Sequence, residues 1–550
     1  MVIPPVTTAP TKPSAKRRRD SNRRPRPPVP PEPSKVTELP VSILPPALQA
    51  LLEALPAGLT LPWELLGPMV LQRIPLANAT LSLWSYLLKP SVLDEIFQKH
   101  RGRSFEDILK FSTFVELIRD ALILHKGSGR ASFQRAEEQG TLPTCQEAVY
   151  HKLGRVPIPL SLGFFEDASQ ELREVLPRGN QVTAIPASLN GMTVTILDGK
   201  QLKNVAKRLW PLRCKPGKVV GGKILVAYLP AEGVAVAMAA DPDGEANDIR
   251  LMPEVVPRAR ARISGIRLWV ADRQFCDLNQ PALLTEQGDH FLIRRSLKTH
   301  FHPDPQRPAQ TSRDAQGRTV VEEWGWIGAV KDKRRRYVRH IHLIRPGEEE
   351  ILLVTDLLDD QQYPASDLLA VYLTRWGIER VFQQITEVFE LRHLIGCTPE
   401  ATIFQAAFCL VIYNLLQVIR AYVAASQVEM PVDAVSVEQI FVDVQKELTA
   451  LTVLFPSPTI ADWFATEMSR EEIIAHLQIL LGGVWTPRYR KAVNKKPRPK
   501  VKKAKGSGAH TSVHKVLEAE RKKRLKSAGG GQRRSRIPST LQVSHVRIIT

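Results

Sequence analysis

Two aspartates and one glutamate stand where they could share one reactive site. Asp198 follows the apolar run 192–197 (MTVTIL), and Asp272 follows a second apolar run, 265–271 (GIRLWVA). Each run has the length and composition of a strand. We predict that each aspartate lies just past the end of its strand, so that both carboxylates enter one crevice. Glu379 lies in a segment of helical periodicity that could pack across the same sheet.

Such a cluster has a definite chemistry, because neighbouring carboxylates repel one another unless cations are bound between them. Hard oxygen ligands favour Mg²⁺ or Mn²⁺. Two such ions can activate a water or a 3′-hydroxyl group and stabilise the leaving oxygen of a phosphodiester. The sequence therefore predicts two Mg²⁺ or Mn²⁺ ions held by Asp198, Asp272 and Glu379. The simpler alternative for each aspartate alone is a turn former or a helix cap.

The segment around Glu379, YLTRWGIERVF, is the sharpest of these signals. Tyr372, Arg375 and Glu379 are three and four residues apart, which puts them on one face of a helix. An adjacent apolar stripe is predicted to face the core and consists of Ile378, Phe382, Ile385 and Phe389. The polar face would then reach the crevice. The alternative is an exposed Arg–Glu pair worth about 0.3–0.5 kcal/mol.

The net charge of +20 is concentrated at the two ends of the 550-residue chain. Residues 1–35 hold nine Lys and Arg against two acids, and residues 488–537 hold nineteen against two. Such cationic segments suit a polyanion, since each neutralised phosphate releases counterions. No uninterrupted apolar run is long enough to span a membrane, and the N-terminal region lacks the apolar segment of a secretory signal. The five scattered cysteines favour a reducing, intracellular location.

The texture of the sequence predicts an α+β multidomain protein, in which a helical part precedes a strand-rich part. Ser104 is a plausible N-cap in the helical part, and 223–229 and 234–240 form a predicted hairpin. The predicted parts are a disordered basic and Pro-rich arm (1–35), a helical domain (36–185), a catalytic domain (186–430) with a β-rich insertion at about 276–365, a helical region (431–487) and a basic, disordered tail (488–550).

The motifs also carry a family resemblance. The setting YLTRWGIERVFQ resembles the tyrosine–arginine–glutamate–lysine signature of bacterial insertion-sequence transposases of the insertion-sequence-four type. LDGK at 197–200 resembles the first-aspartate motif of that group, ADRQF at 271–275 the second, and VTDLLD at 354–359 the segment before the signature helix. The resemblance covers roughly residues 75–425.

This resemblance implies a ribonuclease-H-like catalytic core with a β-strand insertion, preceded by an all-α DNA-binding domain. The same resemblance implies an Asp198–Asp272–Glu379 triad and two divalent metal ions. It also implies double-stranded DNA as partner, both the terminal repeats of an element and its target, and a homodimer that brings two element ends together. The expected activity is metal-dependent strand cleavage and strand transfer, in the cytoplasm of a prokaryote and associated with the nucleoid.

Two positions depart from the signature. The lysine of the group falls at Thr386, seven residues after Glu379, and Gln274 stands where a glycine usually follows Asp-Arg. Both departures bear on the positioning of phosphate rather than on the acids. A lysine at position 386 would add an ammonium group beside the DNA, and we expect it to raise cleavage on the order of tenfold.

Several other residues are candidates for contact with DNA. Trp324 and Trp326 alternate on a predicted strand and could stack on a flipped base, although sheet packing is the commoner role. Arg273 could reach a phosphate or pair with a carboxylate. The full set of predicted DNA-binding residues is Tyr372, Arg375, Arg273, Thr386, Trp324 and Trp326. Two alternative functions remain: a repurposed DNA-binding protein without catalysis, and a ribonuclease-H-like nuclease that cleaves without joining.

Overall fold

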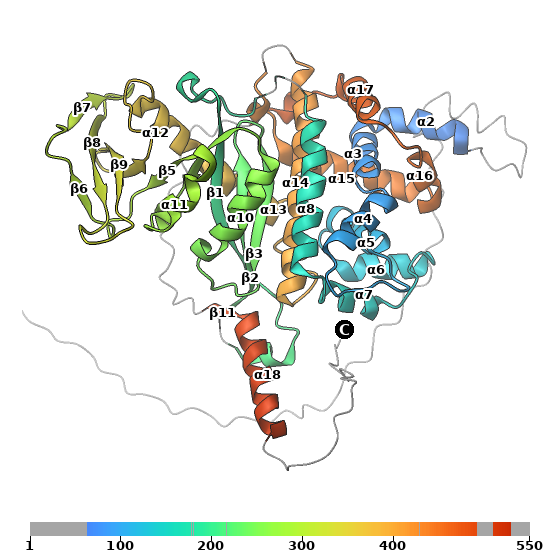
Figure 1. The fold of residues 1–550 in the computed structure, drawn as a ribbon. Helices are drawn as coiled ribbons and strands as arrows, with labels where there is room; N and C mark the ends of the chain where they lie inside the picture. Colours follow the sequence, from blue (N-terminus) through green and yellow to red (C-terminus); the bar gives the residue numbers. More distant parts are fainter. Residues whose placement is uncertain are drawn as a thin grey trace, which may run out of the picture. The chain divides into compact units, whose positions relative to one another are not determined.

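The computed structural model describes residues 63–177, 179, 181–215, 217–427, 430–491 and 510–529. The predicted arm (1–35) and the first part of the predicted helical domain lie outside these residues. The described part begins with helices, continues into a large mixed sheet and returns to helices (Figure 1). The fold is thus a mixed α/β arrangement with an N-terminal helical region.

The N-terminal helices follow the predicted periodicity, and proline defines one of their boundaries. Pro90 is the first residue of its helix, as expected from its missing N–H and fixed φ. Ser104 is not an N-cap, because the helix after it begins only at Phe111, with Lys110 before it. These helices are α2 (Trp63–Arg73), α3 (Pro75–Leu87), α4 (Pro90–His100), α5 (Phe111–Ile123), α6 (Gly129–Glu138), α7 (Gln146–Leu153) and α8 (Ile158–Glu174).

Five strands make the central part of the sheet, in the order β3-β2-β1-β4-β5. Strand β2 is antiparallel to both of its neighbours β1 and β3, and β4 and β5 run parallel to β1. This order, with these directions, is consistent with a ribonuclease-H-like core. The bounds are β1 (Met192–Lys203), β2 (Lys218–Leu229), β3 (Val234–Asp241), β4 (Ile266–Ala271) and β5 (His290–Arg294). The predicted hairpin is confirmed as β2 and β3.

Strands β6 to β10 extend this sheet on the β5 side. These strands lie within the range of about 276–365 that the sequence predicts to be an insertion. The same range also contains β5, which pairs with β4 and so belongs to the central part of the sheet. Strand β10 pairs with β5, so the extension and the central strands are hydrogen-bonded into one sheet. These strands are β6 (Phe301–Pro303), β7 (Gln310–Arg313), β8 (Thr319–Ile327), β9 (Arg336–Leu343) and β10 (Ile351–Thr355).

Helices cover both faces of the central sheet and enclose one apolar cluster on each side. One face packs against α10 (Met252–Arg262), and the other against α12 (Ala365–Thr374), α13 (Trp376–Glu387) and α14 (Pro399–Ala425). The helix α14 lies beside α8 (Figure 1). It is long and apolar enough to cross a membrane, but its most apolar stretch is completely buried inside this protein, as expected for a core helix.

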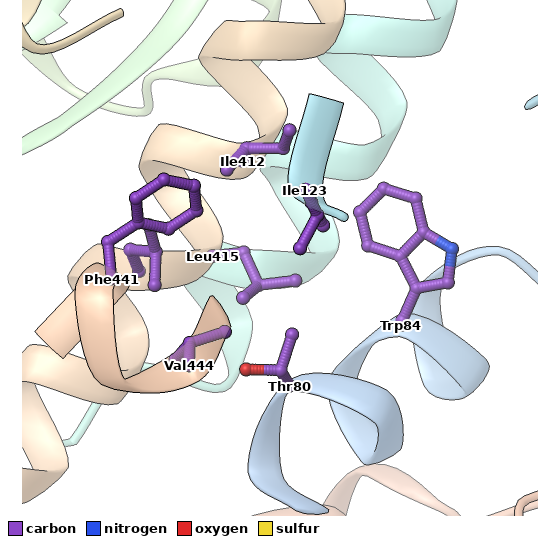
Figure 2. A pocket seen from close by; sticks show the side chains of 8 residues that line it. Thr80, Trp84, Ile123, Ile412, Leu415, Phe441 and Val444 are labelled. Atoms are coloured by element: carbon purple, nitrogen blue, oxygen red, sulfur yellow. The ribbon is translucent and has the colours of Figure 1, made fainter. Parts of the chain in front are cut away.

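The helices after α14 pack back onto the N-terminal ones. Figure 2 shows side chains of α3, α5, α14 and α15 around a void of about 10 Å³. The Thr80 hydroxyl there already donates to the Leu76 carbonyl, so the void is a packing gap rather than a ligand site. The helices are α15 (Val437–Leu454), α16 (Ser457–Trp463) and α17 (Arg470–Leu481).

Short helices join these elements. They are α9 (Trp210–Arg213), α11 (Gln280–Leu284), η2 (Ala187–Leu189), η3 (Asp248–Leu251), η4 (Arg273–Phe275), η5 (Glu286–Gly288), η6 (Val432–Ala434) and η7 (Pro487–Tyr489).

The basic tail departs from the predicted disorder over residues 510–529. Strand β11 (His510–Ser512) pairs in parallel with the first residues of β2, and helix α18 (Val513–Gly529) follows it directly. Val513 is completely buried, and Lys515 pairs with Asp243 and Glu245 on the body of the protein. The tail sequence therefore holds an anchor of one short strand and one apolar residue, which composition alone does not reveal.

Candidate active site

The two aspartates are brought side by side by the register of parallel strands. The pairing of β1 with β4 runs from Met192 and Ile266 to Leu197 and Ala271. The next residue on each strand is Asp198 and Asp272, respectively. Asp272 follows the end of β4, as predicted. Asp198 does not follow the end of β1, because that strand continues to Lys203 through its antiparallel pairing with β2.

Asp198 is largely buried at this position. Its Oδ1 accepts a hydrogen bond from the backbone N–H of Gly199 at 2.9 Å, and its Oδ2 lies 3.5 Å from Nη1 of Arg375. Burial raises the pKa of Asp198 to about 6; the charges of Glu379 and Asp272 act in the same direction, and Arg375 opposes them. The carboxylate is therefore held close to other negative charge.

The helical side of the site comes from α12 and α13, which meet at Arg375. Arg375 keeps helical backbone angles, so the spacing of one helical face is maintained across the junction. Its Nη2 lies 3.0 Å from Oε1 of Glu379, and its guanidinium carbon lies 5.9 Å from the centre of the Tyr372 ring. The apolar stripe is confirmed as core: Ile378, Phe382, Ile385 and Phe389 are all buried.

Two of the three predicted carboxylates share one guanidinium group. In the described ranges, no group of three or more His, Cys, Asp or Glu side chains is arranged to hold a metal ion. The guanidinium of Arg375 contacts both Asp198 and Glu379 instead. Its positive charge relieves the repulsion that a cation would otherwise relieve. The Glu379 side chain is 50% exposed and so can leave this pair at little cost.

Two buried oxygen atoms at the site are left without partners among the described residues, and Nε of the neighbouring Arg375 is a third such polar atom. Within the part of the chain that the structure describes, Oδ1 of Asp272 and the Tyr372 hydroxyl are buried and accept or donate no hydrogen bond. Burial also raises the pKa of Tyr372. Unpaired buried polar groups are rare because each is costly. Carboxylate oxygens are hard ligands, and Oδ1 of Asp272 has no other partner. The two aspartates therefore suit a divalent cation.

Gly199 is required by a neighbour that the sequence did not reveal. A Cβ at this position would lie 2.3–2.5 Å from the carboxyl atoms of Asp248, which is buried. Asp248 is held in turn by Lys223 at 2.5 Å and by Nε2 of Gln274 at 2.5 Å. The departure at Gln274 thus ties the segment after Asp272 to η3. No motif around Asp248 signals this role.

Changing Gly199 to alanine should therefore lower the free energy of unfolding by about 1–3 kcal/mol, because the new methyl group overlaps a carboxyl group that is fixed on both sides. Urea denaturation measures this directly. Gly483→Ala is the control, since a Cβ there meets nothing within 4 Å. Wild-type stability of the Gly199 variant would mean that Asp248 can move aside.

The remaining predicted DNA-binding residues differ in accessibility. Arg273 is 46% exposed and pairs with Glu349 on the surface, and its contact with a DNA phosphate stays a prediction. Trp324 is completely buried, with its indole N–H donating to the Leu358 carbonyl, so no ring face is open to a base. Trp326 is 38% exposed beside Arg335 and stays a prediction.

Thr386 shares an acceptor with a lysine of β1. Its hydroxyl donates to the Phe382 carbonyl oxygen at 2.6 Å, and Nζ of Lys200 donates to the same oxygen at 3.2 Å. Burial lowers the pKa of Lys200 to about 8, and the nearby charge of Lys203 acts in the same direction. Lys200 belongs to the LDGK motif but was not singled out from the sequence.

This mixed sheet, with two aspartates after the paired residues of adjacent central strands, is consistent with a ribonuclease-H-like core. Residues 189–415 match the family model described as the transposase DDE domain. The match contains β1, β4, α12 and α13, and with them Asp198, Asp272 and Glu379.

One solved structure similar to this chain is described as a cryo-EM structure of the piggyBac transposase synaptic complex with hairpin DNA. The identity is 12%, the alignment covers 73% of this chain and 85% of that chain, and the TM-score is 0.35. No curated protein matches this chain.

Proposed function

We propose that this chain is a DDE transposase that cleaves DNA phosphodiesters and joins the freed 3′-hydroxyl to target DNA. The observation that carries the proposal is the register of β1 and β4, which brings Asp198 next to Asp272 within the range that matches the transposase DDE domain. Glu379 is linked to Asp198 by Arg375, which contacts both carboxylates. The finer assignment to the insertion-sequence-four type rests on the signature around these residues.

Asp198, Asp272 and Glu379 would hold the divalent metal ions. When bound, these ions supply an activated nucleophilic oxygen and stabilise the charge of the leaving oxygen. Arg375 would turn from the carboxylates toward a DNA phosphate, for which a guanidinium is a bidentate donor. Tyr372 lies beneath Arg375, and its unpaired hydroxyl is available to orient that phosphate.

Other parts of the chain would bind and assemble. We propose that the helical region before residue 185 recognises the element ends, that two copies act together on two ends, and that the basic segments add affinity independent of sequence. The cellular location that follows is the prokaryotic cytoplasm, in association with the nucleoid.

A supercoiled plasmid carrying the coding sequence between its native flanking DNA tests the proposal. Incubation of the purified full chain with this plasmid and Mg²⁺ should give both cleaved ends and joined products. Cleavage without joining would favour a nuclease, and binding without cleavage would favour a repurposed DNA-binding protein. The same incubation in Ca²⁺ separates binding from chemistry.

The basic residues of α18 are expected to contribute to the salt dependence of DNA binding. Changing Arg521, Lys522, Lys523 and Arg524 to glutamine together should make the salt dependence of DNA binding shallower, by up to about 0.9 per lost phosphate contact in log–log slope. Substitution is cleaner than truncation because β11 belongs to the sheet.

The matched control for this change is Glu518→Gln with Glu520→Gln in the same helix, which removes negative charge and should not weaken binding. Fluorescence anisotropy over a range of salt concentrations gives both slopes. An unchanged slope in the four-residue variant would remove α18 from the DNA interface.

A further inference from the structure

Lys200 lies on the same face of β1 as Asp198. Residues two apart on a strand point to the same side, and the apolar neighbours Ile196 and Leu202 on that side belong to the cluster that packs against α13 and α14. Nζ of Lys200 donates to the Phe382 carbonyl of α13 at 3.2 Å and lies 5.4 Å from the centre of the Phe382 ring. Its ammonium group is therefore fixed between the strand that carries Asp198 and the helix that carries Glu379.

This lysine forms no ion pair in the described residues, although burying an ammonium group without a close partner is costly. The charge of Glu387 acts on it from beyond ion-pair distance. Among the residues that the structure describes, Lys200 forms no ion pair with an aspartate or glutamate, and its polar contact is the Phe382 carbonyl. Lys223 on the neighbouring strand β2 is different, because it pairs with buried Asp248 at 2.5 Å. The charge of Lys223 is neutralised by Asp248 inside the protein. The charge of Lys200 has no ion-pair partner among the described residues, so it can bind another anion.

The position of Lys200 against helix α13 indicates which anion its ammonium group could bind. The Thr386 hydroxyl donates to the same Phe382 oxygen at 2.6 Å, so Lys200 brings its ammonium group to the place on α13 where Thr386 offers only a neutral hydroxyl. Thr386 lies two helical turns from Glu379 on the same face. An ammonium group has three N–H donors, and only one of them is used by the carbonyl.

We propose that Lys200 is a DNA-binding residue of this site, and that it binds a backbone phosphate of the strand at Asp198 and Asp272. It thereby supplies from β1 the positive charge that α13 lacks at Thr386. The proposal rests on the proposed function and names a further residue for it.

Lys200→Met keeps the length and apolar stem of the side chain and removes its charge. Loss of one charge-assisted phosphate contact should lower plasmid cleavage on the order of 10- to 100-fold. Binding to a short random-sequence duplex in Ca²⁺ should lose about 0.9 from its log–log salt slope. Lys203→Met is the control, because Lys203 is exposed at the end of the same strand, and its loss should leave cleavage near wild type.

A lysine at position 386 separates a charge role from a packing role. In the Lys200→Met background, Thr386→Lys should restore most of the lost cleavage, because it returns an ammonium group to the same carbonyl. In the wild-type background the gain should be smaller than the sequence alone suggested, since two ammonium groups would then compete for one region. Failure to restore cleavage in a normally folded double variant would contradict the proposal.

Chemical protection gives an answer that depends on neither cleavage nor a variant. Wild-type protein is acetylated with a lysine-selective reagent, with and without the duplex in Ca²⁺, and modification of Lys200 is measured by mass spectrometry. Protection of Lys200 by DNA is expected. Equal modification with and without DNA, together with an unchanged salt slope for Lys200→Met, would overturn the proposal. A wild-type chain that fails to cleave the plasmid would instead refute the proposed function.

Discussion

Single changes of Asp198, Asp272 or Glu379 to alanine are expected to abolish plasmid cleavage, with losses larger than about a thousandfold. The reason is that the metal ions need all of the carboxylates together, so each ligand is indispensable. For the same reason double changes should cost little more than single ones. Cleavage is followed on the plasmid in Mg²⁺, and binding is measured in Ca²⁺, where all variants should resemble the wild type.

The geometry supplies a control for this experiment. Asp332 is an acid of the surface that pairs with Arg334 and has no contact with the three carboxylates, so Asp332→Ala should cleave normally. Asp198→Ala also removes one of the two acidic contacts of Arg375, and a thermal melt must accompany it. A stable and active variant at any of the three positions would remove that residue from the proposed site.

The parts of the site that were predictable from sequence are those set by local pattern. Asp272 directly follows a short strand that ends on four consecutive apolar residues, so its position could be predicted. The buried faces of Ile378 and Ile385 followed from helical spacing alone. Both signals depend on residues close together in the chain, where periodicity and burial are directly linked.

Features set by pairing between distant segments were not predictable. The apolar pattern of β1 stops at Leu197, yet the strand continues because β2 supplies backbone partners up to Val220. Strand β11 in the basic tail is fixed in the same way, by the edge of β2. Since backbone hydrogen bonds carry no side-chain signature, composition predicted an end in one case and disorder in the other.

The electrostatic arrangement was beyond sequence reasoning for a related reason. The contact of Arg375 with Asp198 joins residues 177 positions apart, while its pair with Glu379 is a local spacing. Local spacing predicted the second contact and could not predict the first. The contact between Asp248 and Gly199 was even less predictable, because it depends on two distant segments that meet only in the folded protein. The missing side chain of Gly199 leaves room there for the Asp248 carboxyl group.

The strand that carries Asp272 is held by a second buried carboxylate, and this gives the largest expected effect on stability. Asp289 is 1% exposed and directly precedes β5. Its Oδ1 accepts from the backbone and the Nε of Arg267 at 3.0 and 2.8 Å, and its Oδ2 accepts from the indole of Trp269 at 3.0 Å. Arg260 of α10 adds a fourth donor at 2.8 Å. Asp289 therefore ties β4 to both its neighbouring strand and the helix above it.

Asp289→Ala should lower the free energy of unfolding by about 3–5 kcal/mol, because breaking a buried pair leaves an uncompensated charge. Arg260 keeps Glu286 as an acidic partner, but Asp289 is the one acid with which Arg267 pairs among the described residues. Urea denaturation measures the loss. Asp332→Ala, which removes a surface partner of Arg334, is the control and should change stability by less than about 1 kcal/mol. A loss for Asp289→Ala no larger than this control would mean that apolar packing alone holds β4, and with it Asp272, in the sheet.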